Sequence, residues 1–165
     1  VAPQILDKRK NVLDESQIYT AKQLPTGPTA VIGGGGAGCD AALFLAQHGV
    51  PVTLIERAPR ILQPEQPMLR LTWQDQLDEA GVTLRTGLNC ISISTSGVVG
   101  VDVVSQTKVE ISAEFVVFAT GGNRRINQAE AFRDASLSFA AVGACVRKTD
   151  LKSAVFDGFC AGTYI

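Results

Sequence analysis

The sequence predicts an α/β fold, and three observations carry that prediction. A short apolar strand over residues 30–32 runs into a glycine-rich string at residues 33–38, and an apolar helix and a second apolar strand over residues 52–55 follow. Hydrophobic residues make up 45% of the chain and charged residues 19%, which fits a sheet buried on both faces. Later strands follow one another without room for helices, which indicates an antiparallel meander. We therefore expect a Rossmann-like parallel sheet with an inserted three-stranded antiparallel meander.

The glycine string follows the frame G-x-G-x-x-G, with Gly33, Gly35 and Gly38 at its three glycine positions. In this frame the first glycine permits a tight turn, the second lets the backbone approach a diphosphate, and the third allows close contact between helix and strand. The helix that follows the glycines begins where a bound diphosphate would lie, so its unpaired N–H groups and the positive end of its dipole would point at the phosphates. Gly34 and Gly36 lie in the same loop, so all five glycines are candidate cofactor-binding residues.

The second strand ends at Glu56, about 20 residues after the third glycine, where the dinucleotide pattern places an acid. A carboxylate here can accept both ribose hydroxyls of an adenosine and repels a 2′-phosphate, which favours NAD(H) over NADP(H). Arg57, also a candidate cofactor-binding residue, and Arg60 weaken that preference, since an arginine can accommodate the phosphate. The alternative is a glycine turn that serves close packing alone; the acid and the two strands favour dinucleotide or ADP binding.

The bulk composition bounds the class of protein. Fifteen basic and sixteen acidic residues give a net charge of −1, so nothing indicates a nucleic-acid or membrane partner. No apolar run approaches the roughly 18 residues of a membrane span and no signal-peptide pattern opens the chain, so we expect a cytoplasmic location. The chain starts at Val1 and its only methionine is Met68, so we expect it to be part of a longer protein. The four cysteines form no C-x-x-C pair, which predicts neither a zinc site nor a redox dithiol.

The other segments are assigned from their patterns. Residues 1–28 are polar and contain prolines, which predicts a linker, and the proline-rich residues 58–67 predict a loop on the ligand side of the sheet. The helix over residues 37–48 ends beside Gly49, so His48 is expected to cap it. A second helix over residues 68–80 is expected to bury one face, made of Leu69, Trp73, Leu77 and Ala80. With a single histidine in the chain, no Ser-His-Asp or Cys-His arrangement can be assembled, and we predict no catalytic side chain and no metal site.

The strands of the second half follow in order. A third strand is expected over residues 82–86, and the meander over residues 90–95, 98–104 and 108–111. Residues 114–118 then return as a buried strand that runs into Ala119-Thr120-Gly121-Gly122. Thr149 or Asp150 is expected to cap the last helix.

These features together resemble the pyridine-nucleotide domain of flavoproteins that have two dinucleotide-binding domains. The string Gly-Gly-Gly-Gly-Ala-Gly-Cys-Asp at residues 33–40 and the tail at residues 139–165 are most similar to one group of NADH:flavin oxidoreductases. That group contains 2,4-dienoyl-CoA reductase and trimethylamine dehydrogenase, and the resemblance, which is to its C-terminal half, covers residues 28–165.

The resemblance implies an NAD(H)-binding domain over residues 29–130 and a C-terminal fragment of a split FAD-binding domain over residues 131–165. The remaining cofactor-binding candidates follow from it: Gly121, Gly143, Ala144 and Ser153. The family has an aspartate where this chain has Ala144, and alanine cannot make its hydrogen bond to the flavin. The chain also has only one glycine cradle, so FAD is expected in the parent protein, with weak or no binding to this chain. The expected partner is an FAD-binding segment or subunit of the parent.

Two functions of different classes remain open. The first is the NAD(H)-binding domain of a flavin oxidoreductase that passes hydride between NADH and FAD, inactive as an isolated chain. The second is a non-catalytic module that binds ADP, or nothing, and serves as a structural or subunit-contact domain. The glycine string and Glu56 favour the first for the parent protein, whereas Ala144 and the missing FAD cradle favour the second for this chain.

Overall fold

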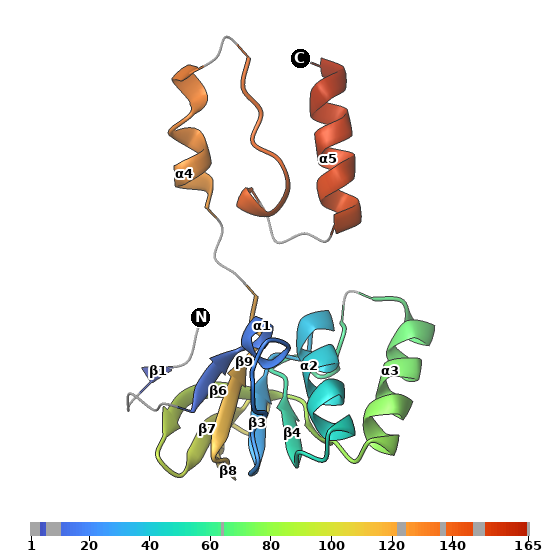
Figure 1. The fold of residues 1–165 in the computed structure, drawn as a ribbon, viewed down its shortest axis with the longest axis vertical. Helices are drawn as coiled ribbons and strands as arrows, with labels where there is room; N and C mark the ends of the chain where they lie inside the picture. Colours follow the sequence, from blue (N-terminus) through green and yellow to red (C-terminus); the bar gives the residue numbers. More distant parts are fainter. Residues whose placement is uncertain are drawn as a thin grey trace. The chain divides into compact units, whose positions relative to one another are not determined.

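A computed structural model gives the fold and describes residues 4–5, 11–63, 65–121, 125–135, 138–146 and 151–164 (Figure 1). The chain divides into two compact units, Val1–Thr120 and Gly121–Ile165. The division lies earlier in the chain than the boundary expected at residue 130. Each unit is described separately.

The first unit is built on a five-stranded parallel sheet with the strand order β2-β9-β3-β4-β5. Its strands are β2 (Val12–Asp14), β3 (Thr29–Ile32), β4 (Val52–Ile55), β5 (Thr83–Arg85) and β9 (Phe115–Phe118). Three helices belong to this unit: α1 (Glu15–Ile18), α2 (Gly36–Gln47) and α3 (Pro67–Glu79). In Figure 1, α2 and α3 lie next to each other beside β4, and buried side chains of all three helices share a core with this sheet.

A second, four-stranded sheet has the order β1-β6-β7-β8. The strands β6 (Leu88–Ser94), β7 (Gly97–Asp102) and β8 (Lys108–Ser112) form an antiparallel meander, and β1 (Gln4–Ile5) pairs with β6 in parallel. The predicted fold class is confirmed: a Rossmann-like parallel sheet with an inserted three-stranded antiparallel meander.

The centre of the parallel sheet is buried on both faces because alternate residues of β9, β3 and β4 enter two different cores. On one face Val31 of β3 and its register neighbours Leu54 and Val117 pack with the helices. On the other face the buried residues pack with the meander: Ala30, Ile32, Ile55 and Val116 contact a cluster that includes Leu88, Ile93 and Val98. The first unit therefore has three layers, namely the helices, the parallel sheet and the meander.

The expectation that residues 1–28 form a linker needs correction. β2 is an edge strand of the parallel sheet, with Leu13 opposite Val117 of β9. The following α1 begins with a capping box, in which the Gln17 side chain accepts from the Asp14 N–H at 2.7 Å, and the Asp14 side chain also accepts from the Ser16 N–H at 3.2 Å. Ile18 is only 1% exposed and belongs to the core. The strand has three residues, which is too short for a periodic pattern to reveal it.

The expected apolar face of α3 is only partly correct. Leu77 is fully buried, and Trp73 and Ala80 are half-buried against the core. Leu69 is 45% exposed, because the first turns of α3 extend past the core and expose Met68 as well.

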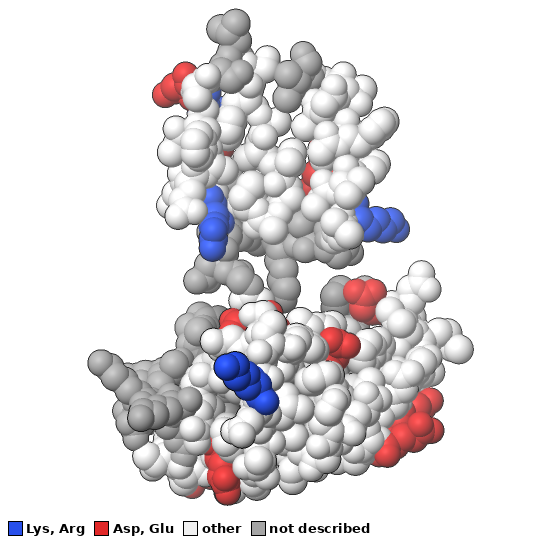
Figure 2. All heavy atoms as spheres, in the orientation of Figure 1, with Lys and Arg blue, Asp and Glu red and all other residues white. Residues whose placement is uncertain are grey.

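The second unit contains α4 (Ile126–Glu130), two 3₁₀ turns (Arg133–Ala135 and Gly143–Cys145) and α5 (Leu151–Tyr164). The turn Gly143–Cys145 packs against α5. Thr149 and Asp150, expected to cap α5, lie outside the described residues. On the face shown in Figure 2, uncharged atoms dominate this unit. Within the described ranges of both units, no helix has the length and apolar character that crossing a bilayer requires.

Candidate dinucleotide site

The candidate site lies at the carboxyl edge of the parallel sheet, around the start of α2. Gly33 follows β3, Glu56 follows β4 and Ala119 follows β9, so parallel pairing brings these residues to one edge. The Gly33 N–H donates to the Ile55 carbonyl at 2.8 Å, and the Ala119 N–H donates to the Ile32 carbonyl at 2.9 Å. The chain leaves β3 toward β4 on one side and returns through β9 on the other, which is the switch point where ligands of such sheets bind.

Two glycines of the string lie too close to neighbouring backbone to carry a side chain. Gly33 has φ +114°, and a Cβ there would lie 2.5 Å from the Ala119 carbonyl oxygen. A Cβ on Gly38 would lie 1.7 Å from the Gly33 carbonyl oxygen. A side chain at Gly33 would collide with the backbone that follows β9, and one at Gly38 would push α2 away from the end of β3, so both glycines are explained without a ligand.

Gly35 and Gly36 have no such packing reason. A Cβ added at either residue would meet nothing within 4 Å. Gly35 is the N-cap of α2 and offers no capping side chain, and Gly36 and Ala37 are exposed. Because the first N–H groups of a helix have no partner within it, the start of α2 presents donors to open space. This arrangement fits the diphosphate of a dinucleotide, since a bare backbone can approach the anion closely.

Glu56 makes contacts that sequence patterns did not reveal. Its Oε2 accepts from the Gly34 N–H at 2.6 Å, and its Oε1 accepts from the Ala58 N–H at 2.6 Å. The carboxylate thus ties the glycine loop to the segment after β4. Each oxygen retains a second acceptor site, so a ribose hydroxyl can still be accepted. The Gly34 donor lies 22 residues before Glu56 in the sequence, so no local pattern indicates that contact.

Residues 57–62, which we call the strap, lie against the glycine loop. The Leu62 N–H donates to the Gly34 carbonyl at 2.8 Å, and Leu62 adopts a left-handed backbone with φ +48°. Such a backbone is strained for leucine, and the contact with the loop helps to hold it. Ile61 is 1% exposed, and its Cγ2 would be 3.0 Å from a Cβ on Gly34. Arg57 and Arg60 of the strap are exposed.

An aromatic row runs along α2. The Tyr19 hydroxyl donates to Asp40 Oδ2, and its ring centroid lies 5.1 Å from that of Phe44. Partial burial and the bond to Asp40 raise the pKa of Tyr19 above its ordinary value. The Phe44 ring lies 4.4 Å from that of His48, whose Nδ1 is 2.7 Å from the Phe44 carbonyl oxygen. His48 is the C-cap residue of α2 and precedes Gly49 at φ +80°, as predicted.

Cys39 lies directly under the glycine loop, with Sγ 3.6 Å from the Gly34 carbonyl oxygen. Burial, with a smaller contribution from the Glu56 charge, raises the pKa of the Cys39 thiol to about 12. Burial likewise raises the pKa of Cys90 to about 11. Both thiols stay protonated at neutral pH, so neither is an activated nucleophile.

The remaining candidates lie after β9. Gly121 is exposed and has φ +81°. Gly143 is buried at φ +70°, and a Cβ there would lie 3.3 Å from the Ala154 Cβ of α5. Ala144 is exposed, and Ser153 is half-buried in the first turn of α5. The structure thus brings Gly143 and α5 together within the second unit, while the glycine loop and Glu56 form their own group in the first.

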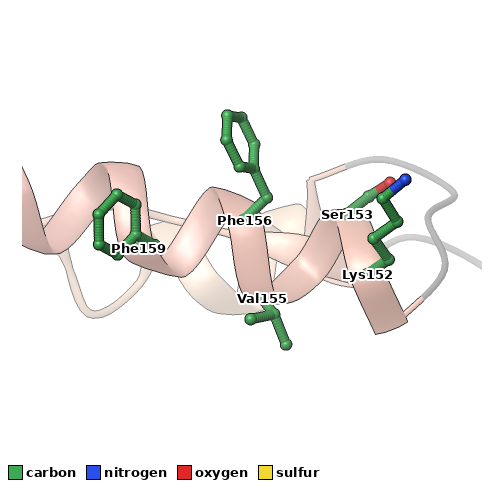
Figure 3. A pocket seen from close by; sticks show the side chains of 5 residues that line it. All are labelled: Lys152, Ser153, Val155, Phe156 and Phe159. Carbon is green, nitrogen blue, oxygen red and sulfur yellow. The ribbon is translucent and has the colours of Figure 1, made fainter.

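An apolar hollow of about 450 Å³ borders α5 and is lined by Lys152, Ser153, Val155, Phe156 and Phe159. Figure 3 shows that Val155 and Phe156 project to opposite sides of the helix, so the lining side chains do not converge on one point. Phe156 and Phe159 are 64% and 72% exposed. We therefore interpret the hollow as open apolar surface and not as a ligand pocket.

The fold and the glycine loop define the class of this protein, a dinucleotide-binding α/β domain of the flavin oxidoreductase type. The chain belongs to the pyridine nucleotide-disulphide oxidoreductase family, whose model matches residues 3–162. The match spans both units and includes most of residues 1–28.

Relatives show how much of a larger protein the chain represents. It is 28% identical over 159 residues to the bilirubin reductase of Mediterraneibacter gnavus (strain CC55_001C), covering 96% of this chain and 24% of that protein. The fold matches a 2-naphthoyl-CoA reductase in complex with 2-naphthoyl-CoA, at TM-score 0.82 and 23% identity over 100% of this chain and 25% of that one. Histamine dehydrogenase from Rhizobium sp. 4-9 gives TM-score 0.80 at 18% identity, over 98% and 27%. The chain spans about a quarter of the length of these relatives.

Proposed function

We propose that this chain binds NAD(H), in preference to NADP(H), as the nucleotide-binding domain of a flavin-dependent oxidoreductase. The observation that supports the proposal is the start of α2, where Gly35 and Gly36 leave the backbone bare and no packing demand explains them. We further propose that the parent protein belongs to the group of 2,4-dienoyl-CoA reductase and trimethylamine dehydrogenase. A cytoplasmic location is part of the same proposal.

Different residues of the first unit bind the diphosphate and the ribose of the nucleotide. The N–H groups at the start of α2 hold the diphosphate, aided by the positive end of the helix dipole. Glu56 accepts from the ribose through the second acceptor site of each oxygen and disfavours a 2′-phosphate, against the opposing effect of exposed Arg57 and Arg60. The bound nicotinamide would supply a hydride and the flavin would accept it. The protein itself contributes position and exclusion of water, and no side chain is assigned to bond making.

The domain division is a proposal as well: residues 29–130 for NAD(H) and residues 131–165 for part of an FAD-binding domain. In the second unit Gly143 and Ser153 would face the flavin, with an FAD-binding segment of the parent as partner. Ala144 has only a methyl group and makes no hydrogen bond to a flavin. We therefore propose that this chain alone retains little or no FAD.

Ala144 also favours a second candidate function, a non-catalytic module that binds ADP without a productive nicotinamide site. In such a module the start of α2 would still hold a diphosphate. The two functions differ in whether the nicotinamide half adds affinity.

Calorimetric titration with NADH, NADPH and ADP tests both candidates. Gly35→Ala places a methyl group in the open space before α2, so we expect it to weaken binding of all three nucleotides by about tenfold or more while the protein stays folded. Gly158→Ala on α5 is the matched control, because a Cβ there also meets nothing within 4 Å. NADH binding no tighter than ADP binding supports the second candidate. If the unsubstituted chain binds none of the three, the dinucleotide function is wrong.

A further inference from the structure

In the part of the chain that the structure describes, Glu56 is the one side chain that accepts hydrogen bonds from both the glycine loop and the strap. Its two oxygens accept from Gly34 in the glycine loop and from Ala58 in the strap, each at 2.6 Å. Both contacts are short for N–H···O bonds and involve an ionised acceptor, which is the stronger kind. The strap closes the arrangement through the Leu62 N–H, which donates to the Gly34 carbonyl at 2.8 Å.

Two of these hydrogen bonds fix the planes of two successive peptide units, and the third, from Ala58, holds the Glu56 carboxylate in place. The peptide bond is planar, so the carbonyl of one residue and the N–H of the next point in opposite directions. The Leu62 contact holds the Gly34 carbonyl and thereby sets the direction of the Gly35 N–H. The Glu56 contact holds the Gly34 N–H and thereby sets the peptide between Gly33 and Gly34.

Such fixing matters because the loop consists of consecutive glycines. Glycine has more backbone freedom to lose than any other residue, so an unrestrained loop presents its N–H groups in many directions. An anion site gains affinity when its donors are already oriented. The strap is itself anchored, since the Gly87 N–H donates to the Ala58 carbonyl at 2.9 Å.

We propose that Glu56 is a positioning residue for the diphosphate: through the backbone of Gly34 and Ala58 it holds the glycine loop ready to bind. This inference rests on the proposed function and refines it. Its distinctive consequence is that the contribution of Glu56 to affinity does not require ribose hydroxyls. A residue that acted only by contacting the sugar would contribute nothing to a nucleotide without them.

The test compares ADP with 2′,3′-dideoxy-ADP, which keeps the diphosphate and lacks both ribose hydroxyls. Affinities of the full chain are measured by calorimetry for the unsubstituted protein, Glu56→Ala and Glu56→Gln. We expect Glu56→Ala to weaken 2′,3′-dideoxy-ADP by about tenfold, as expected when a binding group is misplaced by a fraction of an ångström. ADP should weaken by at least that factor, because it also loses the ribose contact. Glu56→Gln keeps one acceptor oxygen and should lose less. Glu65→Gln, an exposed acid just beyond the strap, controls for the removal of a negative charge.

A second measurement keeps the test decisive if Glu56→Ala is poorly folded. Glu56→Gln replaces one acceptor oxygen by an NH2 group, so amide hydrogen exchange at Gly34 or at Ala58 is expected to be faster than in the unsubstituted chain, both without ligand. Exchange at both amides is expected to be unchanged in Glu65→Gln. A loss confined to ADP, with dideoxy-ADP unaffected, overturns the inference and leaves a sugar contact in its place. Unchanged exchange at both Gly34 and Ala58 also overturns it. If the unsubstituted chain binds neither nucleotide, the proposed function itself is wrong, and this outcome is distinguishable from the two that overturn only the role of Glu56.

Discussion

Cys39 shows how burial alone determines the chemistry of one residue. The side chain is 0% exposed, and the thiolate form would lose its hydration beneath the glycine loop. The pKa is therefore raised to about 12, from 9.0 for an unfolded thiol. The thiol packs like a small apolar group, even though it lies beside a candidate cofactor site.

This pKa predicts a loss of stability in alkaline solution. Above pH 9 the unfolded chain releases the Cys39 proton while the folded chain keeps it, so the free energy of unfolding falls as the pH rises from 9 toward 12. Cys39 should account for a loss of about 1 kcal/mol between pH 8 and pH 10. Urea unfolding of Cys39→Ala should show a pH dependence smaller by that amount. Cys160→Ala, which removes a half-exposed thiol, is the matched control. A pH dependence of Cys39→Ala equal to that of the unsubstituted chain would contradict the assignment.

At the residue scale, the sequence predicted which residues lie at the candidate site, but it did not predict the hydrogen bonds that they make. The G-x-G-x-x-G frame located Gly33, Gly35 and Gly38, because each glycine position has a backbone reason. The distance from the frame to Glu56 located the acid. The hydrogen bonds of Glu56 to Gly34 and Ala58 were not predictable, since they depend on how the strap folds back, and the strap has no repeating pattern.

Among the elements, predictability followed length and pattern. β3, α2 and β4 lie within one or two residues of their expected ranges, because strand, glycine loop and helix follow one another locally. β2 was missed because it has three residues and its partner β9 lies about a hundred residues further along the chain. Here the tertiary pairing decides the conformation, and local preference carries no signal.

The corrected role of the N-terminal segment makes a prediction about α1. Ile18 is 1% exposed in the core shared with α2, so Ile18→Ala should lower the free energy of unfolding by about 2 to 4 kcal/mol. Chemical denaturation measures this loss. Val104→Ala is the control, because Val104 is 92% exposed and its truncation should change stability by less than about 0.5 kcal/mol. A loss for Ile18→Ala as small as that of the control would return the segment to the status of a linker.

The whole molecule consists of one unit with a substantial core and one without. The first unit has buried clusters on both faces of its parallel sheet. In the second unit, Gly143 is the only buried residue among those described, and α4 and α5 bury none. The family match nevertheless extends to residue 162, so both units belong to the same family region.

This contrast predicts the behaviour of the separated units. A chain of residues 1–120 should unfold cooperatively, with a free energy of unfolding within about 0.5 kcal/mol of that of the complete chain and with the same ADP affinity. Residues 121–165 alone should show no cooperative transition, because they lack a core. Far-UV circular dichroism during heating and calorimetry with ADP measure both. A marked loss of stability or affinity in residues 1–120 would show that the second unit completes the first.

The steric contacts of the glycine string have a consequence for reading other chains. Any homologue with this fold would be expected to keep Gly33 and Gly38, whether or not it binds a nucleotide, because a side chain at either position collides with backbone. A side chain at Gly35 would meet no such collision. A homologue that keeps glycine at positions 33 and 38 but has a bulkier residue at position 35 would be expected to keep the fold and to have lost nucleotide binding. The residue at position 35 would therefore distinguish homologues that bind a nucleotide from those that do not.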